Sequence, residues 1–170
     1  GYYPTVFEKN EKPGGMLTYG IPSYKLEKDV IDAEIEIMKE MGVEIRTGIE
    51  VGNDITIPEL RKDGYKAFYI AVGCQGGRYP NVPNDHAEGT ETAVEFLKKA
   101  TTGNCHFDDE TVVVGGGNVA IDAARVSARS GAKKVTMLCL ESKDIMPASD
   151  EEIAEAEEDG VVINCGWGPK

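Results

Sequence analysis

The sequence has 170 residues, of which 41% are hydrophobic, and its formal net charge is -12 at pH 7. This length suits one ordinary domain or two small ones, and the hydrophobic content is enough for a folded core. The negative charge argues against nucleic acid and anionic membranes as partners, because their phosphate groups would be repelled by most of the surface.

No apolar run reaches the length of a membrane span, and the N-terminus lacks the basic and apolar regions of a signal peptide. The cysteines, Cys74, Cys105, Cys139 and Cys165, include no Cys-x-x-Cys pair. We therefore predict reduced thiols in a cytoplasmic protein, each a small buried apolar residue, with no disulfide framework and no metal site. The chain lacks an initiator Met, and we expect both of its ends to be cut from a longer protein.

The first half of the sequence alternates strands with helices. Strands are predicted over residues 5–7, 43–47 and 67–72, with a loop over residues 12–15. A helix is predicted over residues 26–41, and its apolar face is Val30, Ala33, Ile37 and Met41. Thr56 and Glu59 form a capping-box pattern with Pro58 between them, so a short helix should follow. The strand over residues 67–72 is predicted to be buried and to end at Gly73.

The second half begins after residues 74–89, which are rich in Gly, Pro and Asn and have no hydrophobic period. We place a domain boundary there, between residues 1–77 and residues 78–170. Beyond it, strands are predicted over residues 111–114, 134–140 and 161–163, and helices over residues 92–101, 118–130 and 149–159, the first and last opened by capping boxes. This order predicts an α/β fold with a mostly parallel sheet and flanking helices. The acidic run over residues 150–159 is predicted to be a solvated helix face, not a metal site.

A glycine-rich turn joins the strand over residues 111–114 to the helix that follows it. The turn consists of Gly115, Gly116, Gly117, Asn118, Val119 and Ala120. Gly115 permits unusual backbone angles, Gly117 leaves room for a pyrophosphate, and Ala120 lets the helix pack closely on the strand. The helix N-terminus offers free amides to phosphate, so the turn indicates a dinucleotide site. The alternative is a tight strand–helix turn that holds no ligand.

Glu141 stands at the end of the next predicted strand. An acid in this place can accept hydrogen bonds from both hydroxyls of the adenosine ribose, and it would repel a 2'-phosphate. If Glu141 faces the ribose, the cofactor is NAD(H) rather than NADP(H). The alternative is a solvated loop residue.

Segments covering nearly the whole chain carry a resemblance to a known family. They are residues 5–8 (TVFE), 13–22 (PGGMLTYGIP), 71–73 (AVG), 113–125 (VVGGGNVAIDAAR) and 146–149 (MPAS). In this order they resemble an internal stretch of the glutamate synthase small-subunit family, which is of the pyridine nucleotide-disulfide oxidoreductase type. That family includes the flavin portions of dihydropyrimidine dehydrogenase and of ferredoxin-NADP oxidoreductase subunits.

The resemblance implies two Rossmann-like domains, an FAD-binding domain and an NAD(P)-binding domain inserted into it. NAD(P)H would give hydride to FAD, and electrons would leave through iron–sulfur clusters carried by another domain or subunit. On this chain it implies that Glu8 holds the FAD ribose. It also places Gly14, Gly15, Met16 and Leu17 along the flavin, and Gly73 close to the cofactor. No side chain is expected to be a proton-transfer catalyst, because hydride transfer to flavin depends mainly on alignment.

The sequence departs from the family pattern in ways that bear on activity. The family's FAD glycine turn should precede Thr5 and is absent, so the chain alone is not expected to bind FAD. The iron–sulfur region and the return of the chain into the FAD domain are also absent, so the fragment is expected to be inactive by itself. Many members carry paired arginines where Leu140 and Glu141 stand, and their replacement favours NAD(H).

Three other functions remain open from the sequence. A short-chain dehydrogenase would need Tyr-x-x-x-Lys after the glycine turn, whereas the matching pair, Tyr24 and Lys28, lies before it. An NAD(H)-binding sensor or regulatory module would bind the dinucleotide without catalysis. A protein-interaction scaffold with a vestigial site would not bind NADH at all. Incomplete sheets would expose strand edges, so self-association is also a prediction.

Overall fold

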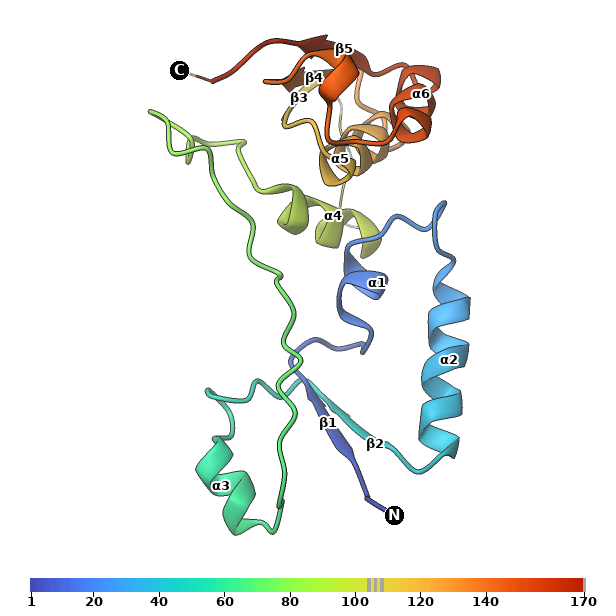
Figure 1. Ribbon diagram of the computed structural model, residues 1–170, viewed down its shortest axis with the longest axis vertical. Helices are drawn as coiled ribbons and strands as arrows, with labels where there is room; N and C mark the ends of the chain where they lie inside the picture. The colour runs from blue at the N-terminus through green and yellow to red at the C-terminus, as the bar shows by residue number, and fades with distance from the viewer. Residues whose placement is uncertain (104, 106, 108, 170) are drawn as a thin grey trace. The chain divides into compact units, whose positions relative to one another are not determined.

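The computed structural model describes residues 1–103, 105, 107 and 109–169. Its internal contacts divide the chain into two units (Figure 1). Unit 1 comprises Gly1–Tyr19 and Ser23–Cys74, and unit 2 comprises Gly20–Pro22 and Gln75–Lys170. Each unit contains a parallel sheet with helices, so the predicted α/β class is confirmed.

Unit 1 is built on two parallel strands, β1 (Thr5–Glu8) and β2 (Glu44–Thr47), with Thr5 opposite Glu44. Its helices are α1 (Gly15–Tyr19), α2 (Lys28–Glu40) and α3 (Ile57–Lys62). Tyr65 fastens the chain after α3 to β1, because its hydroxyl donates to Thr5 Oγ1 at 3.1 Å and its ring packs edge-on against Phe7. The short helix α1 was not predicted from the sequence, where two glycines and a proline indicated a loop.

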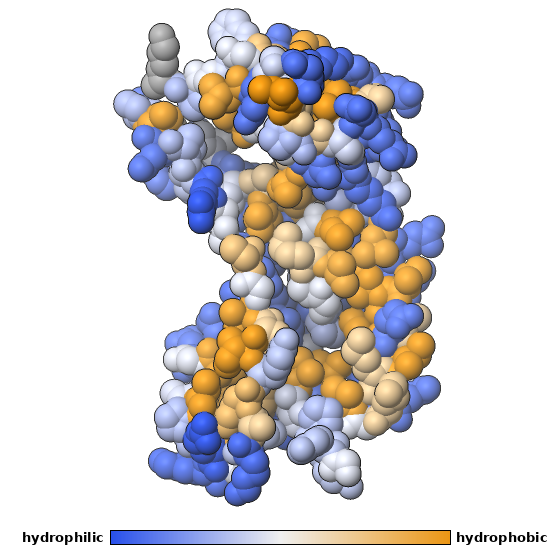
Figure 2. Space-filling model, viewed as in Figure 1, coloured by the Kyte–Doolittle hydropathy of each residue, from blue (hydrophilic) through white to orange (hydrophobic). Residues whose placement is uncertain are grey.

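Helix α2 buries a different face from the predicted one. Ile31 and Ile35 are its buried residues, whereas the predicted apolar residues Val30, Ala33, Ile37 and Met41 are exposed, Met41 by 80%. The helix carries two neighbouring apolar stripes, and the fold of unit 1 covers the stripe of Ile31, whose side chain lies beside Gly14. Figure 2 shows the resulting apolar surface over the region of α2.

The prediction of a strand over residues 67–72 is wrong. This segment has no strand assignment, and Tyr69, Ile70 and Val72 are 93%, 66% and 78% exposed. A β-strand is stabilised by hydrogen bonds to a neighbouring strand. Within the described residues β1 pairs with β2, and no strand pairs with residues 67–72. Figure 1 draws the segment as a plain extended trace.

Unit 2 contains a three-stranded parallel sheet in the order β3-β4-β5. The strands are β3 (Glu110–Val114), β4 (Lys134–Cys139) and β5 (Val162–Cys165). The helices are α4 (Ala93–Thr101), α5 (Asn118–Arg129), the single 3-10 turn η1 (Lys143–Ile145), and α6 (Asp150–Glu158). The strands and α-helices follow the predicted order, and their ends differ from the predicted ones by at most two residues. The turn η1 was not predicted.

The core of unit 2 lies between the sheet and the helices α5 and α6. Alternate residues of β4 point into it, so Val135, Met137 and Cys139 are almost completely buried. They pack with Ala120, Ile121 and Ala124 of α5 and with Ile153 and Ala156 of α6. A second cluster, Phe96, Leu97 and Ala123, fixes α4 to α5. Helix α5 is therefore held on several sides, and its N-terminus has a fixed place at the end of β3.

The acidic helix α6 is only partly the solvated face that was predicted. Arg125 of α5 is 5% exposed and forms ion pairs with Glu155 and with Asp159, the latter at 2.7 Å, and lies 3.9 Å from Glu152. Arg129 adds a contact of 3.0 Å to Asp159. A buried guanidinium needs such partners, because an uncompensated charge is costly in the interior. The inward carboxylates of α6 therefore anchor it to α5.

Capping patterns predict helix starts well in this chain. At Thr56 of α3 and Thr92 of α4, both halves of the capping box are formed, with Glu59 and Glu95 as partners. At α6 only one half forms: Ser149 Oγ accepts from the amide of Glu152. The amide of Ser149 instead donates to Asn118 Oδ1 at 3.1 Å, while the Glu152 side chain approaches Arg125. Tertiary contacts have replaced the local bond.

The four thiols are free and differ in burial. Cys139 is buried, Cys105 and Cys165 are half-buried, and Cys74 is exposed, so the prediction of burial is wrong for Cys74. Cys74 follows the extended segment of residues 67–72, which lacks a sheet partner to cover it. Across the described residues, no helix is both long enough and apolar enough to cross a membrane.

We predict that Arg125→Ala lowers the free energy of unfolding by about 1.5–3 kcal/mol, because it removes a buried guanidinium that pairs with the partly exposed carboxylates of Glu155 and Asp159. Urea unfolding measured by circular dichroism checks this. Arg129→Ala is the matched control: its side chain is 45% exposed, so its loss should cost at most about 1 kcal/mol. Equal costs for the two variants would contradict the buried role of Arg125.

Candidate functional site

The glycine turn begins where β3 ends. The amide of Gly115 donates to the carbonyl of Leu138 at 2.9 Å, which continues the pairing of β3 with β4 by one residue. Gly115 has φ 142°, and a Cβ at this position would lie 3.3 Å from Cβ of Ala120. Its backbone angle and this close approach both require glycine. The small residues Gly115 and Ala120 thus let α5 start directly against the end of the strand.

Gly117 differs from the other two glycines of the turn. It has φ -96° and ψ 173°, which any residue can adopt, and apart from its two chain neighbours no described residue has a heavy atom within 4 Å of the place where a Cβ would stand. Nothing within the protein therefore requires a glycine here. The open space above Gly117 lies directly at the N-terminus of α5, where a bound group could approach the backbone.

The N-terminus of α5 is uncapped. Its N-cap residue is Gly117, which has no side chain to accept a hydrogen bond, and the first turn contains no acidic residue. The amides of Ala120 and Ile121 donate to the carbonyl of Gly117, at 2.9 Å and 3.1 Å. In the part of the chain that the structure describes, no hydrogen bond uses the amides of Gly117, Asn118 or Val119. Helices α3, α4 and α6, by contrast, are all capped by Thr or Ser and carry acids in their first turns.

The loop before α6 braces this turn. The amide of Ala148 donates to the carbonyl of Gly116 at 2.9 Å, and the amide of Ser149 donates to Asn118 Oδ1 at 3.1 Å. The side chain of Asn118 is thus engaged within the protein, while its backbone amide has no hydrogen bond among the described residues. Sequence reasoning missed these two contacts, although residues 146–149 were part of the family resemblance.

Glu141 lies beside the glycine turn. Its Oε2 accepts a hydrogen bond from Cys139 Sγ at 3.1 Å. A Cβ on Gly116 would stand 2.4 Å from Cys139 Sγ and 3.2 Å from Glu141 Oε2, so both side chains press against the turn. The structure therefore brings together Glu141 and the turn of residues 115–120, which are far apart in the sequence.

The charge states of this pair are fixed by their surroundings. The hydrogen bond from Cys139 lowers the pKa of Glu141, which keeps its carboxylate ionised at neutral pH. Burial, followed by the hydrogen bond to Glu141, raises the pKa of the Cys139 thiol to about 11. Cys139 is therefore a protonated donor. The sequence did not predict this contact, because Glu141 lies beyond the end of β4, where strand alternation no longer applies.

The remaining predicted site residues lie in unit 1. Glu8 Oε1 accepts hydrogen bonds from the amide and the side chain of Asn10, at 2.8 Å and 2.7 Å. A Cβ on Gly14 would stand 2.1 Å from Thr18 Oγ1, so the fold itself explains this glycine. Gly15, Met16 and Leu17 form the first turn of α1, and Leu17 is 48% exposed.

Gly73 is exposed, with φ 67°, at the end of the extended segment of residues 67–72. No described hydrogen bond or ring contact joins Gly73 to Glu8 or to Gly14. The assignment of Glu8, Gly14, Gly15, Met16, Leu17 and Gly73 to FAD stays a prediction, whereas Glu141 and the glycine turn of unit 2 lie side by side.

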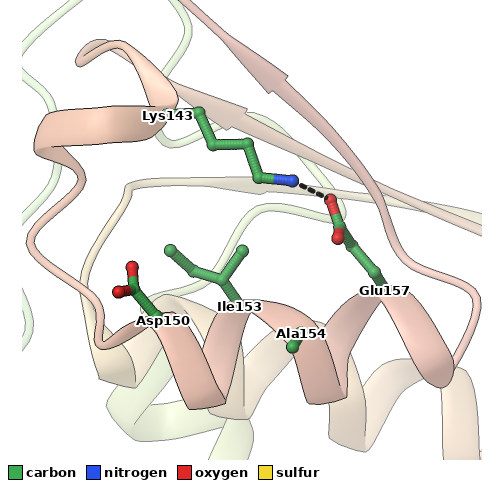
Figure 3. Close-up of a pocket in the computed structure, with 5 residues that line it drawn as sticks. All are labelled: Lys143, Asp150, Ile153, Ala154 and Glu157. Carbon is green, nitrogen blue, oxygen red and sulfur yellow. Dashed lines mark hydrogen bonds and ion pairs between the residues drawn. The ribbon is translucent and has the colours of Figure 1, made fainter.

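A shallow surface cavity of about 200 Å³ lies over α6 (Figure 3). Its lining residues are Lys143, Asp150, Ile153, Ala154 and Glu157. Lys143 Nζ reaches across to Glu157 Oε1 at 2.5 Å, and this hydrogen bond raises the pKa of Lys143. The cation and the carboxylate satisfy each other, and no residue of the glycine turn lines the cavity, so we do not assign the site there.

Comparison with known proteins decides the family. The sequence profile of the pyridine nucleotide-disulphide oxidoreductase family matches residues 14–166. The chain belongs to this family. The family resemblance inferred from the sequence is thereby confirmed, and the glycine turn of unit 2 lies within the matched region.

Several curated relatives cover nearly all of this chain. It is 39% identical to the NADP(+)-dependent formate dehydrogenase subunit beta of Moorella thermoacetica, over 96% of the chain and 24% of that protein. It is 37% identical to the NAD-dependent dihydropyrimidine dehydrogenase subunit PreT of Escherichia coli K12, over 99% of the chain and 41% of the relative. It is 36% identical to the glutamate synthase [NADPH] small chain of the same organism, over 99% of the chain and 38% of that relative. The chain thus spans about two fifths or less of the length of these relatives.

Solved structures share the fold. FprA from Mycobacterium tuberculosis in complex with NADPH superposes with a TM-score of 0.72 at 20% identity, covering 91% of this chain and 40% of FprA. A 2-naphthoyl-CoA reductase complex gives a TM-score of 0.73 at 18% identity, covering 98% of this chain and 24% of the reductase. These likenesses confirm a Rossmann-like α/β fold with parallel sheets and flanking helices.

We predict that Gly116→Ala lowers the free energy of unfolding by about 1–3 kcal/mol, because its Cβ would overlap Cys139 Sγ. The variant Cys139→Ala lacks the sulfur. In that background Gly116→Ala should lower the free energy of unfolding clearly less than it does in the presence of Cys139. Thermal unfolding of the four members of this cycle measures the coupling. Strict additivity would contradict the contact between Cys139 and the turn.

Proposed function

We propose that this chain is the nucleotide-binding portion of a flavin-dependent oxidoreductase of the glutamate synthase small-subunit type. In the intact parent, NAD(P)H, with NADH favoured, passes hydride to FAD, and the electrons continue to iron–sulfur centres in another domain or subunit. The observation that carries this proposal is Gly117, a glycine that the protein itself does not need, placed at the uncapped N-terminus of α5.

The N-terminus of α5 suits a pyrophosphate. Aligned peptide dipoles give a helix N-terminus the equivalent of about half a positive charge, and its free amides point at an incoming anion. The amides of Gly117, Asn118 and Val119 would hold the phosphates, and the open space above Gly117 allows the close approach. The absence of an acid from the first turn avoids repulsion. When bound, the nicotinamide supplies the hydride, and the chain's task is to bind and align it.

The choice between NADH and NADPH rests on Glu141. The relatives do not decide it, because their names refer to NADP(+), to NAD and to NADPH. Glu141 is ionised and lies against the glycine turn, where the adenosine ribose of a bound dinucleotide would come close. Its carboxylate would accept hydrogen bonds from the ribose hydroxyls of NADH and would repel the 2'-phosphate of NADPH.

FAD is proposed as a cofactor of the intact parent only. In unit 1 the residues assigned to it make contacts within the protein: Glu8 Oε1 accepts hydrogen bonds from Asn10, Gly14 packs against Thr18, and Gly73 follows an extended segment that pairs with no described strand. We therefore expect the chain alone to bind the dinucleotide without reducing an acceptor. The relatives are named as subunits or chains of larger enzymes, which supports a partner carrying the onward electron acceptor.

We predict that Gly117→Val abolishes NADH binding, because the valine side chain would fill the space that the pyrophosphate needs. The variant should still fold, since the backbone angles of Gly117 suit any residue and the weaker N-cap costs about 1 kcal/mol. NADH fluorescence titration measures the binding. Gly76→Val is the matched control, because Gly76 is also unstrained and surrounded by open space. Unchanged affinity in a folded Gly117→Val protein would refute the site.

We also predict that Glu141→Arg shifts the preference toward NADPH by about 1–3 kcal/mol, because it removes a repulsion and adds a charge-assisted hydrogen bond. The measurement is the ratio of the Kd values for NADPH and NADH. Glu158→Arg on α6 makes the same change of net charge at an exposed position and should leave the ratio almost unchanged. A ratio that Glu141→Arg leaves at its original value would show that Glu141 does not face the ribose.

A further inference from the structure

We propose that Cys139 is a positioning residue for coenzyme selectivity: its thiol holds the Glu141 carboxylate against the glycine turn, in the orientation that discriminates between NADH and NADPH. This inference rests on the function proposed above. It assigns a role to a buried cysteine that does not itself touch the coenzyme.

The placement of the two side chains follows from the sheet. Cys139 is the last residue of β4 and is completely buried, and the chain beyond the strand brings the Glu141 side chain back to its thiol. Their contact of 3.1 Å lies directly over Gly116, as the short distances from a Cβ at that position to both side chains show. Any side chain at residue 116 would separate Glu141 from the turn or displace the thiol. Gly116 and Cys139 are thus fitted to each other.

The backbone around Glu141 is already fixed by other contacts. The amide of Gly166 donates to the carbonyl of Glu141 at 3.0 Å, and the amide of Trp167 donates to the carbonyl of Cys139 at 2.9 Å. The direction of the Glu141 side chain is therefore the main freedom that remains. The hydrogen bond from Cys139 restricts this direction, and the backbone at Glu141 adds a second hydrogen bond to the same carboxylate.

The Cys139 thiol acts as a hydrogen-bond donor over the whole physiological pH range. Because burial raises its pKa to about 11, it stays protonated and can donate to the ionised carboxylate. A thiol is a weak donor, so its contribution lies in direction more than in strength. Without it, the carboxylate can turn toward solvent, where it would repel a 2'-phosphate less and bind the ribose less well. Loss of the thiol should then lower the discrimination against NADPH.

The test compares the Kd ratio, NADPH over NADH, in this chain and its variants. Cys139→Ala should lower the ratio about three- to tenfold, the range expected for one orienting hydrogen bond. Cys139→Ser keeps a donor in place and should retain most of the wild-type ratio. Cys165→Ala is the matched control, because Cys165 stands opposite Cys139 on β5 but contacts Met146 Sδ at 3.8 Å and not Glu141. It should leave the ratio unchanged.

A ratio of affinities separates positioning from stability. Both coenzymes need the same folded unit, so a partly unfolded variant weakens the two Kd values together and leaves their ratio intact. In a Glu141→Gln background, Cys139→Ala should have no further effect on the ratio, because the acceptor charge is already gone.

The outcomes separate this inference from the function on which it rests. NADH binding by the wild type, with an unchanged ratio in Cys139→Ala, overturns the role of Cys139 and leaves the dinucleotide site standing. If Cys165→Ala lowers the Kd ratio as much as Cys139→Ala does, the role of Cys139 is also overturned, because the effect then comes from the core in general. Failure of the wild type to bind NADH overturns both proposals.

Discussion

The start of α5 at the end of β3 is the constraint on which unit 2 depends. Gly115 and Ala120 permit the close approach of helix and strand, and Ile121 and Ala124 fix α5 on the sheet. The loop before α6 then ties the carbonyl of Gly116 and the side chain of Asn118. These contacts hold the turn in place and leave the amides of Gly117, Asn118 and Val119 without a described hydrogen bond. The anion site that we propose there depends on packing and on backbone amides, not on a charged side chain.

This arrangement assigns different tasks to different glycines. Gly115 serves the backbone and Gly116 makes room for Cys139 and Glu141, so both are explained within the protein. Gly117 has no such contact among the described residues. We propose that it makes room for a pyridine nucleotide, in keeping with the family to which the chain belongs. In the same proposal the Cys139–Glu141 pair adds selectivity at the edge of the turn.

Sequence patterns predicted best those features that local contacts determine. The capping boxes at Thr56 and Thr92 and the strand–turn–helix around Gly115 were found because their signals lie within a few residues. Features set by distant partners were missed: the buried face of α2, the inward carboxylates of α6, and the diversion of the Ser149 amide to Asn118. The apolar segment of residues 67–72 resembles a buried strand in sequence, yet it has no neighbouring strand within the described residues. Composition alone cannot supply that neighbour.

The most direct test of the open α5 N-terminus is a titration of the isotope-labelled chain with NADH, followed by amide proton–nitrogen NMR spectra. The account predicts that saturable shifts concentrate at the amides of Gly116, Gly117, Asn118 and Val119. The capped N-termini of α3 and α4 provide internal references and should not respond. Shifts spread evenly over the helix N-termini, or none at the glycine turn, would contradict the central claim that this turn holds the dinucleotide.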